Sequence, residues 1–290
     1  MHDRRDELIE ATPAPRVQRV FAWYATRLLR KRFAAVRCAP GTVDAIATLG
    51  APGAGAEPAE RAPRLLAMSH ASWWDPIVVS FLWRAHFSAT PVFAPMDARE
   101  LNRFRFMRKL GIFGIDPDEP RSLPAMLRYL GRVTEAKPET VIAITPQGRF
   151  TDPREPLVIR PGAAAIAARL GVRTAVVLAV EYAFWNDAKP EVFLRAERVA
   201  MPTAPTTSRW QDALERAMAS NGAALAELVR RRDPAAFEDA LARRSSVHPV
   251  YDLWLSLTGR GRGIETTHRS EGAGQDGDRR ANDRLQELRS

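Results

Sequence analysis

A histidine and an aspartate stand five residues apart where a buried strand is predicted to pass into a helix. His70 follows the apolar run 64–68, and Asp75 comes directly before Pro76, which is typical of a helix start. Ligand crevices of open α/β sheets form at strand ends, so both side chains can meet a substrate there. An imidazole is suited to take a proton near neutral pH, and a carboxylate on its second ring nitrogen fixes the tautomer. The spacing indicates general-base chemistry, with one alternative, namely that Asp75 only caps the helix.

A second candidate loop follows another predicted strand. Residues 140–144 read as a buried strand, and the loop 145–150 (TPQGRF) begins where that strand ends. A glycine in such a turn lets backbone amides approach an anion. Two arginines near this loop form a fork for a phosphate or are solvated loop charges. The candidate substrate-binding residues are Pro146, Gln147, Gly148, Arg149 and Arg160.

Four stretches resemble, in order, the motifs of the glycerolipid acyltransferase family, whose archetype acylates 1-acylglycerol-3-phosphate. The first is 69–76 (SHASWWDP), and the second is 93–116, which closes on Gly-Ile-Asp. The third is the loop 145–150 with its continuation 157–162, and the fourth is 171–180. The resemblance covers about residues 64–182.

The resemblance implies a fatty acyl transfer from acyl-CoA or acyl-carrier protein to a hydroxyl of a lysophospholipid-like acceptor. His70 is then the general base, oriented by Asp75, and the third block holds the acceptor's phosphate and supports the histidine. Gln147 and Phe150 stand where that family usually has Glu and Arg. Two alternatives therefore stay open: an acceptor hydroxyl on a non-phosphate lipid or glycolipid, and a non-catalytic membrane-surface protein on the same fold.

The composition of the chain limits the classes of partner that it can bind. The chain has 290 residues, a net charge of +9, a pI near 10.5 and a single cysteine, Cys38. This charge suits an anionic partner, and an anionic membrane surface is preferred because the sequence has no nucleic-acid reader motif. The resemblance implies an acyl thioester as co-substrate, and because the sequence has no metal-ligand motif, no metal and no cofactor are expected.

The expected location is cytoplasmic and peripheral, on the inner face of a membrane. The N-terminus is too charged for a signal peptide, and no apolar stretch approaches the roughly 18 residues of a membrane span. Residues 16–38 have seven basic residues and no acidic one, which predicts a basic amphipathic helix. This helix lies in the membrane interface or packs on its own domain. The candidate membrane-facing residues are Arg19, Phe21, Arg27, Leu28, Arg30 and Lys31.

Alternating strand and helix patterns predict one α/β domain with a largely parallel central sheet flanked by helices. We expect an N-terminal amphipathic helix and C-terminal helices to be added to it, and the oligomeric state stays open. The predicted organisation is a disordered leader at 1–15, the amphipathic helix at 16–38, a loop or linker at 39–63, the acyltransferase core at 64–200, a helical extension at 201–258 and a disordered tail at 259–290.

Overall fold

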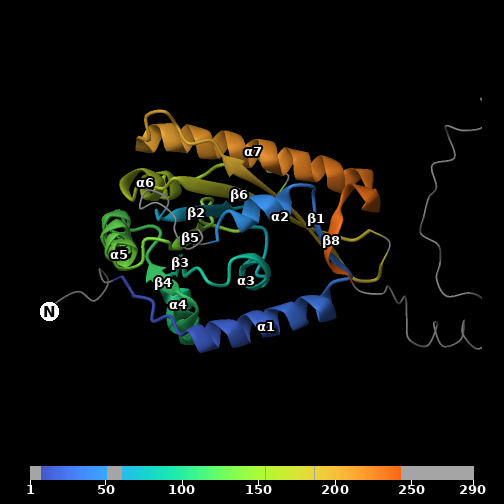
Figure 1. The fold of residues 1–290 in the computed structure, drawn as a ribbon, viewed down its shortest axis with the longest axis horizontal. Helices are drawn as coiled ribbons and strands as arrows, with labels where there is room; N and C mark the ends of the chain where they lie inside the picture. The colour runs from blue at the N-terminus through green and yellow to red at the C-terminus, as the bar shows by residue number, and fades with distance from the viewer. Residues whose placement is uncertain (1–7, 51–60, 154, 186, 243–290) are drawn as a thin grey trace, which may run out of the picture. The chain divides into compact units, whose positions relative to one another are not determined.

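The computed structural model describes residues 8–50, 61–153, 155–185 and 187–242. It has the predicted α/β fold, with a mostly parallel sheet between layers of helices (Figure 1). The strands, in chain order, are β1 (Ala35–Cys38), β2 (Arg64–Met68), β3 (Val92–Asp97), β4 (Ile112–Ile115), β5 (Val141–Ile144), β6 (Thr174–Ala183), β7 (Glu191–Val199) and β8 (Glu238–Ala242).

Among these strands the spatial order is β4-β3-β5-β2-β6-β7-β1-β8. Strands β4, β3, β5, β2 and β6 all run parallel, whereas β7 is antiparallel to β6. The carboxyl ends of the first five strands therefore meet at one edge. The turn after β2 lies there between the loop after β5 and the end of β6, which brings both candidate loops together.

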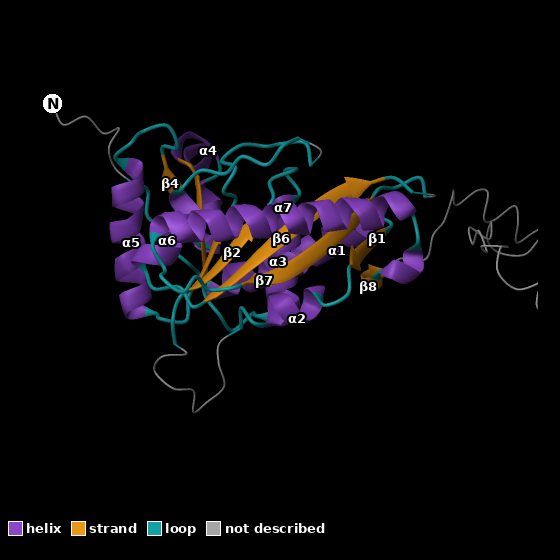
Figure 2. Cartoon of the chain, turned by 90° about the horizontal axis from the view of Figure 1, so that it is seen from above, coloured by secondary structure: helices purple, strands orange, loops and turns teal. Residues whose placement is uncertain are grey.

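The helices are α1 (Pro15–Arg32), α2 (Thr42–Ala47), α3 (Asp75–His86), α4 (Ala98–Arg103), α5 (Ser122–Ala136), α6 (Gly162–Arg169) and α7 (Thr207–Arg231), with the 3-10 helices η3 (Arg105–Leu110) and η4 (Pro234–Ala236). Figure 1 shows α6 and α7 on one side of the sheet and α1 and α3 on the other. Seen from above in Figure 2, α7 runs over β6 and β7.

Strand alternation builds a core on each side of the sheet. In β2, Leu66 and Met68 join the core with α3, whereas Leu65 and Ala67 join the core with α5, α6 and α7. Side chains of successive strand residues point to opposite faces, so a strand buried on both faces is apolar throughout. This explains why β2 and β5 were recognisable in the sequence as apolar runs.

Residues near the N-terminus differ from the predicted leader. Ile9 forms an antiparallel bridge with Gly114 of β4, with N–H···O distances of 3.0 and 2.8 Å, and the Ala11 amide donates to the Tyr129 hydroxyl. Residues 8–14 are therefore ordered along the outer edge of β4, because its free backbone groups need partners. Residues 1–7 lie outside the described part of the chain.

The predicted helix over 16–38 is wrong in its last six residues. The helix ends at Arg32, and Phe33 is buried in edge-to-face contact with Trp74, with ring centroids 4.9 Å apart. The chain then extends into β1, which pairs with β7 and β8. The predicted linker 39–63 likewise contains a short helix, α2, which buries Thr42, Ala45 and Ile46.

The C-terminal part also differs from the prediction of helices alone. After α7 the chain enters β8, which pairs antiparallel with β1, and Arg37 of β1 bonds Asp239 of β8 at 2.7 Å. This pairing gives hydrogen-bond partners to backbone groups of β1 that would otherwise be unpaired at the edge of the sheet. The predicted helical segment beyond residue 242 and the predicted disordered tail lie outside the described residues.

Replacing Gly111, which links η3 to β4, tests how this sheet edge is built. Gly111 has φ +100°, and a Cβ there would lie 2.1 Å from the Val92 carbonyl oxygen of β3. Gly111→Ala should lower the free energy of unfolding by more than about 2 kcal/mol in urea denaturation, since both strain and a backbone clash arise. The matched control is Gly131→Ala in α5, where a Cβ meets nothing within 4 Å. That variant should gain about 0.5–1 kcal/mol, and equal effects of the two would contradict this reading.

Candidate functional site

His70 and Asp75 lie together at the carboxyl edge of the sheet. His70 Nδ1 is 2.8 Å from Asp75 Oδ2, and the carboxylate also accepts a bond of 3.0 Å from the Ser72 amide. A carboxylate only accepts, so Nδ1 carries the proton and Nε2 is left as the basic nitrogen. The arrangement can take a proton from a hydroxyl placed at Nε2.

The capping alternative for Asp75 is not what the structure shows. Helix α3 begins at Asp75 itself, and its N-cap residue, Trp74, makes no side-chain cap bond. The Asp75 side chain is turned back to the β2–α3 turn and is only 1% exposed. On its other oxygen, Oδ1, it accepts a bond of 2.7 Å from the Tyr182 hydroxyl of β6. The carboxylate therefore accepts hydrogen bonds from the β2–α3 turn and from β6, and it does not cap α3.

The backbone of His70 is held by the second loop. Gln147 accepts from the His70 amide at 2.7 Å through Oε1 and donates to the Thr151 hydroxyl through Nε2. The Thr151 amide in turn donates to the His70 carbonyl at 2.9 Å. Beside it, Ser69 Oγ accepts from the Val180 amide of β6 at 3.0 Å. Gln147, predicted to bind substrate, therefore positions the histidine backbone in this structure.

The two arginines that were candidates for a phosphate fork, Arg149 and Arg160, differ from each other in their contacts. The side chain of Arg160 passes next to Gly148, whose φ is +68°. Its guanidinium donates to the Pro117 carbonyl at 2.7 Å and to the Asp118 carboxylate at 3.4 Å. The Arg160 amide donates to the carbonyl of Pro146 at 2.8 Å. Arg149 is exposed, and both arginines line the same cavity as His70. Arg160 is thus already engaged with the loop after β4, whereas Arg149 stands at the cavity rim.

A cavity of about 650 Å³ opens at His70. Apolar side chains from β2, α3, β4 and α5 line its depth, among them Met68, Val79, Ile112 and Met126. Such a lining favours a ligand with a long apolar part and few polar groups.

Aromatic rings stand at the mouth of this cavity. The Phe150 ring lies on the imidazole of His70 with centroids 4.2 Å apart, and Trp73 lies 5.5 Å from Phe150. Trp73 is 56% exposed and Phe150 is 43% exposed, although both are large apolar side chains. The position of the usual family arginine is therefore part of an aromatic rim beside the base.

Sequence reasoning missed Tyr182 and Thr151. Tyr182 lies just beyond the fourth motif, and its hydroxyl reaches Asp75 only because β6 pairs with β2 in the register Met68↔Leu178. A polar aromatic residue near the carboxyl end of a strand was the one available signal. Thr151 lies one residue beyond the motif, and nothing in its spacing marks it.

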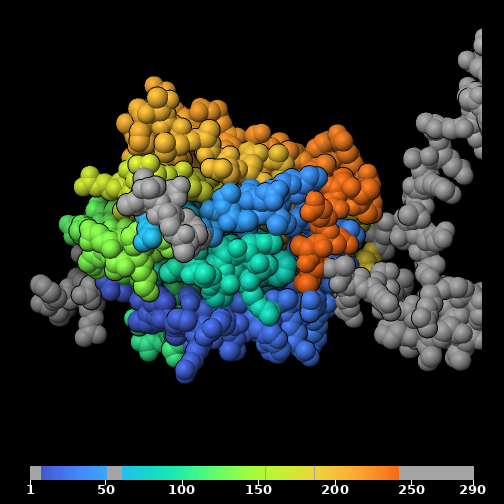
Figure 3. All heavy atoms as spheres, viewed as in Figure 1, coloured from blue at the N-terminus to red at the C-terminus, as the bar shows by residue number. Residues whose placement is uncertain are grey.

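Helix α1 packs against α3, and Figure 3 shows the two helices side by side at the surface. Its buried face is Ala22, Ala25, Thr26 and Leu29, so this face of the amphipathic helix lies in the core. Of the predicted membrane-facing residues, Arg19, Arg27, Arg30 and Lys31 are exposed, whereas Phe21 and Leu28 are half-buried. The helices of the described chain include none that is both long and apolar enough to cross a bilayer.

In the described chain, no three His, Cys, Asp or Glu side chains gather so that they could hold a metal ion. The arrangement around His70 is a hydrogen-bonded histidine–aspartate pair beside an apolar cavity. A family model described as Acyltransferase matches residues 54–181, a segment that contains His70, Asp75 and the loop 145–150. This match agrees with the resemblance of the four motifs to the acyltransferase family over the same part of the chain. A comparison with curated proteins finds no match.

The role of Gln147 in holding the turn can be tested by stability. Gln147→Leu removes the acceptor of the His70 amide and the donor to Thr151, so unfolding in urea should cost about 1–3 kcal/mol less. Gln147→Glu keeps an acceptor for that amide and serves as the matched control, with a smaller loss. If Gln147→Leu is as stable as the wild type, the side chain does not support the histidine backbone.

Proposed function

We propose that the chain transfers a fatty acyl group from an acyl thioester, acyl-CoA or acyl-carrier protein, to a hydroxyl of a lysophospholipid-like acceptor. The single observation that carries the proposal is the His70–Asp75 pair at the mouth of an apolar cavity within the acyltransferase segment. The cavity supplies room for an acyl chain, and the pair supplies the base.

In the proposed reaction the acyl group passes directly from the thioester to the acceptor hydroxyl, and no covalent acyl-enzyme forms. His70 Nε2 takes the acceptor's hydroxyl proton as the oxygen attacks the thioester carbonyl carbon. The tetrahedral oxyanion then collapses, the C–S bond breaks, and the imidazolium returns its proton to the leaving thiolate. Asp75 holds the tautomer and stabilises the imidazolium during the step.

One observation favours the alternative acceptor, a lipid or glycolipid hydroxyl without a phosphate. Arg160 is engaged with Pro117 and Asp118, and Phe150 occupies the place of the family's usual arginine. Arg149 is then the cation left to receive a phosphate at the rim. A non-catalytic protein on this fold is the outcome that the following experiment would reveal.

His70→Ala should reduce thiol release from palmitoyl-CoA, measured with 1-oleoyl lysophosphatidate or a lipid extract, by at least about 100-fold. His86→Ala is the matched control, since His86 lies at the far end of α3 and should leave the rate unchanged. Burial raises the pKa of Cys38 to about 12, so the folded protein itself adds no reactive thiol to the assay. A His70→Ala variant that keeps more than about a tenth of the rate would refute the assignment.

We also propose that the protein works peripherally on an anionic membrane surface, with α1 in contact. The exposed side of α1 combines basic residues with Val20, Trp23 and Tyr24, which are 66%, 53% and 49% exposed. Amphipathic helices of this composition lie in the membrane interface. Phe21 continues the surface toward the cavity, because it also lines the cavity, and its ring is 6.2 Å from Phe106 of η3.

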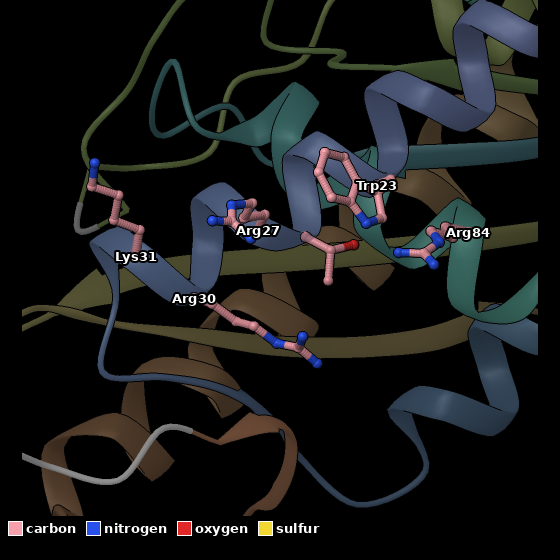
Figure 4. Close-up of a pocket in the computed structure, with 6 residues that line it drawn as sticks. Trp23, Arg27, Arg30, Lys31 and Arg84 are labelled. Carbon is pink, nitrogen blue, oxygen red and sulfur yellow. The ribbon is translucent and has the colours of Figure 1, made fainter.

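A groove on this surface is lined by cations from two helices (Figure 4). Arg27, Arg30 and Lys31 come from α1 and Arg84 from α3, and Arg27 lies over the Trp23 ring at 5.9 Å. None of the residues that line the groove is acidic. The charge suits lipid phosphates, and the tryptophan suits the headgroup level.

The triple variant Arg27→Gln, Arg30→Gln and Arg84→Gln should sediment less with vesicles that contain about 30% anionic lipid. Each basic side chain near such a surface contributes about 1 kcal/mol to the free energy of membrane binding. The control is Arg169→Gln, Arg209→Gln and Arg216→Gln, which removes the same charge from exposed sites on α6 and α7, across the sheet. Equal losses in the two variants would show a net-charge effect and would contradict the proposed surface.

A further inference from the structure

Tyr182 touches the dyad from a strand that the motifs do not assign to the site. It lies near the end of β6, where Tyr182 pairs with Val192 of β7 in a continuous antiparallel ladder. Its hydroxyl lies 2.7 Å from Asp75 Oδ1. The segment matched by the family model ends one residue earlier, at 181.

The hydrogen bonds to Asp75 divide between its two oxygens. Oδ2 receives both His70 Nδ1 and the Ser72 amide, whereas the described donor to Oδ1 is the Tyr182 hydroxyl. Aromatic rings cover this side, with Phe33 5.8 Å from Tyr182 and 4.9 Å from Trp74. Because Asp75 is almost fully buried, water does not replace a lost donor cheaply.

We propose that Tyr182 is a positioning residue that acts on His70 through Asp75. It fixes the carboxylate by a hydrogen bond to Oδ1 and takes up part of its negative charge, so that less of this charge falls on the imidazole. The catalytic meaning of this role rests on the proposed function, whereas the electrostatic role belongs to the three side chains themselves.

The phenol is suited to this role. Burial, and then the negative charge of Asp75, raise the pKa of Tyr182 well above its ordinary value, so its hydroxyl remains a donor. If the donor is removed, the carboxylate's charge falls more fully on the imidazole, and the imidazolium is favoured. The acid limb of the pH–rate profile then moves to higher pH, because the base must be neutral.

Other charged groups around the dyad do not bond it in the described structure. Those lining the same cavity are Asp97, Glu100, Asp116, Glu119, Arg149 and the Arg160–Asp118 pair. Glu181 precedes Tyr182 and so faces the opposite side of the sheet, and Glu191 of β7 pairs with Arg37. These groups are unchanged in the variants below, so a shift between variants reports on Tyr182.

The first readout is the ring titration of His70, followed by NMR in substrate-free protein and assigned with His70→Ala. In Tyr182→Phe the midpoint should rise by about one pH unit, since a charged neighbour changes a proton affinity by that order. Tyr129→Phe is the matched control, because Tyr129 is also buried and its hydroxyl is bonded to the Ala11 amide. Its midpoint should equal that of the wild type.

The second readout is thiol release as a function of pH. At pH values below the acid limb, the rate of thiol release by Tyr182→Phe should be about tenfold lower than that of the wild type. At alkaline pH its rate should return to within a few-fold of the wild-type rate. Tyr182→3-fluorotyrosine, which keeps the ring and makes the hydroxyl a stronger donor, should move the titration midpoint of the His70 ring down. This second variant also covers the case in which Tyr182→Phe does not fold.

An unchanged or lowered midpoint in Tyr182→Phe would overturn the proposal. So would a loss of rate that is equal at every pH, since that is the mark of a purely structural role. If the wild type releases no thiol from palmitoyl-CoA, the proposed function fails, while the ring titration still decides the role of Tyr182.

Discussion

The buried carboxylate of Asp75 is the interaction around which this site is built. An ionised carboxylate with 1% exposure is unfavourable unless its oxygens find donors. Its three donors come from two parts of the chain: the Ser72 amide and the His70 ring from the turn after β2, and the Tyr182 hydroxyl from β6. The carboxylate thereby ties the start of α3 to two neighbouring strands, and the histidine gains a defined tautomer.

Strand order makes this possible. Strand β2 lies between β5 and β6, and all three run parallel, so their carboxyl ends deliver the histidine turn, the Gln147 loop and Tyr182 to one edge. Gln147 then holds the His70 backbone from the β5 side, and Ser69 bonds β6 on the other. The histidine is thus fixed through its main chain and its ring, while the apolar cavity extends beneath it toward β4 and α5.

The parts of the fold that the sequence predicted are those with a strong local signal. Strands β2 and β5 are apolar runs because both faces are buried, and the order of four motifs indicated the family. Strands β1 and β8 escaped prediction because each is short and depends on a partner far along the chain, as in Val36↔Leu241. Helix α1 was predicted, and its packing on the domain was one of the two alternatives left open, but the small residues Ala22 and Ala25 on its buried face did not indicate α3 as the partner.

The same distinction applies to the site. His70 and Asp75 are five residues apart, so their meeting followed from one turn, whereas Tyr182 is 107 residues from Asp75 and meets it only through strand register. The two arginines near the second loop were visible, but spacing did not reveal that Arg160 bonds the loop after β4. Long-range register, rather than residue type, decided which of the candidate side chains face the base.

The central claim is that Asp75 makes His70 a general base for acyl transfer. The most direct test is the rate of thiol release from palmitoyl-CoA by Asp75→Asn, compared with wild type at equal folded concentration. An amide of the same shape holds the imidazole in the wrong tautomer and lacks the charge, so the account predicts a loss of at least about 100-fold. An Asp75→Asn enzyme that keeps the wild-type rate would contradict it.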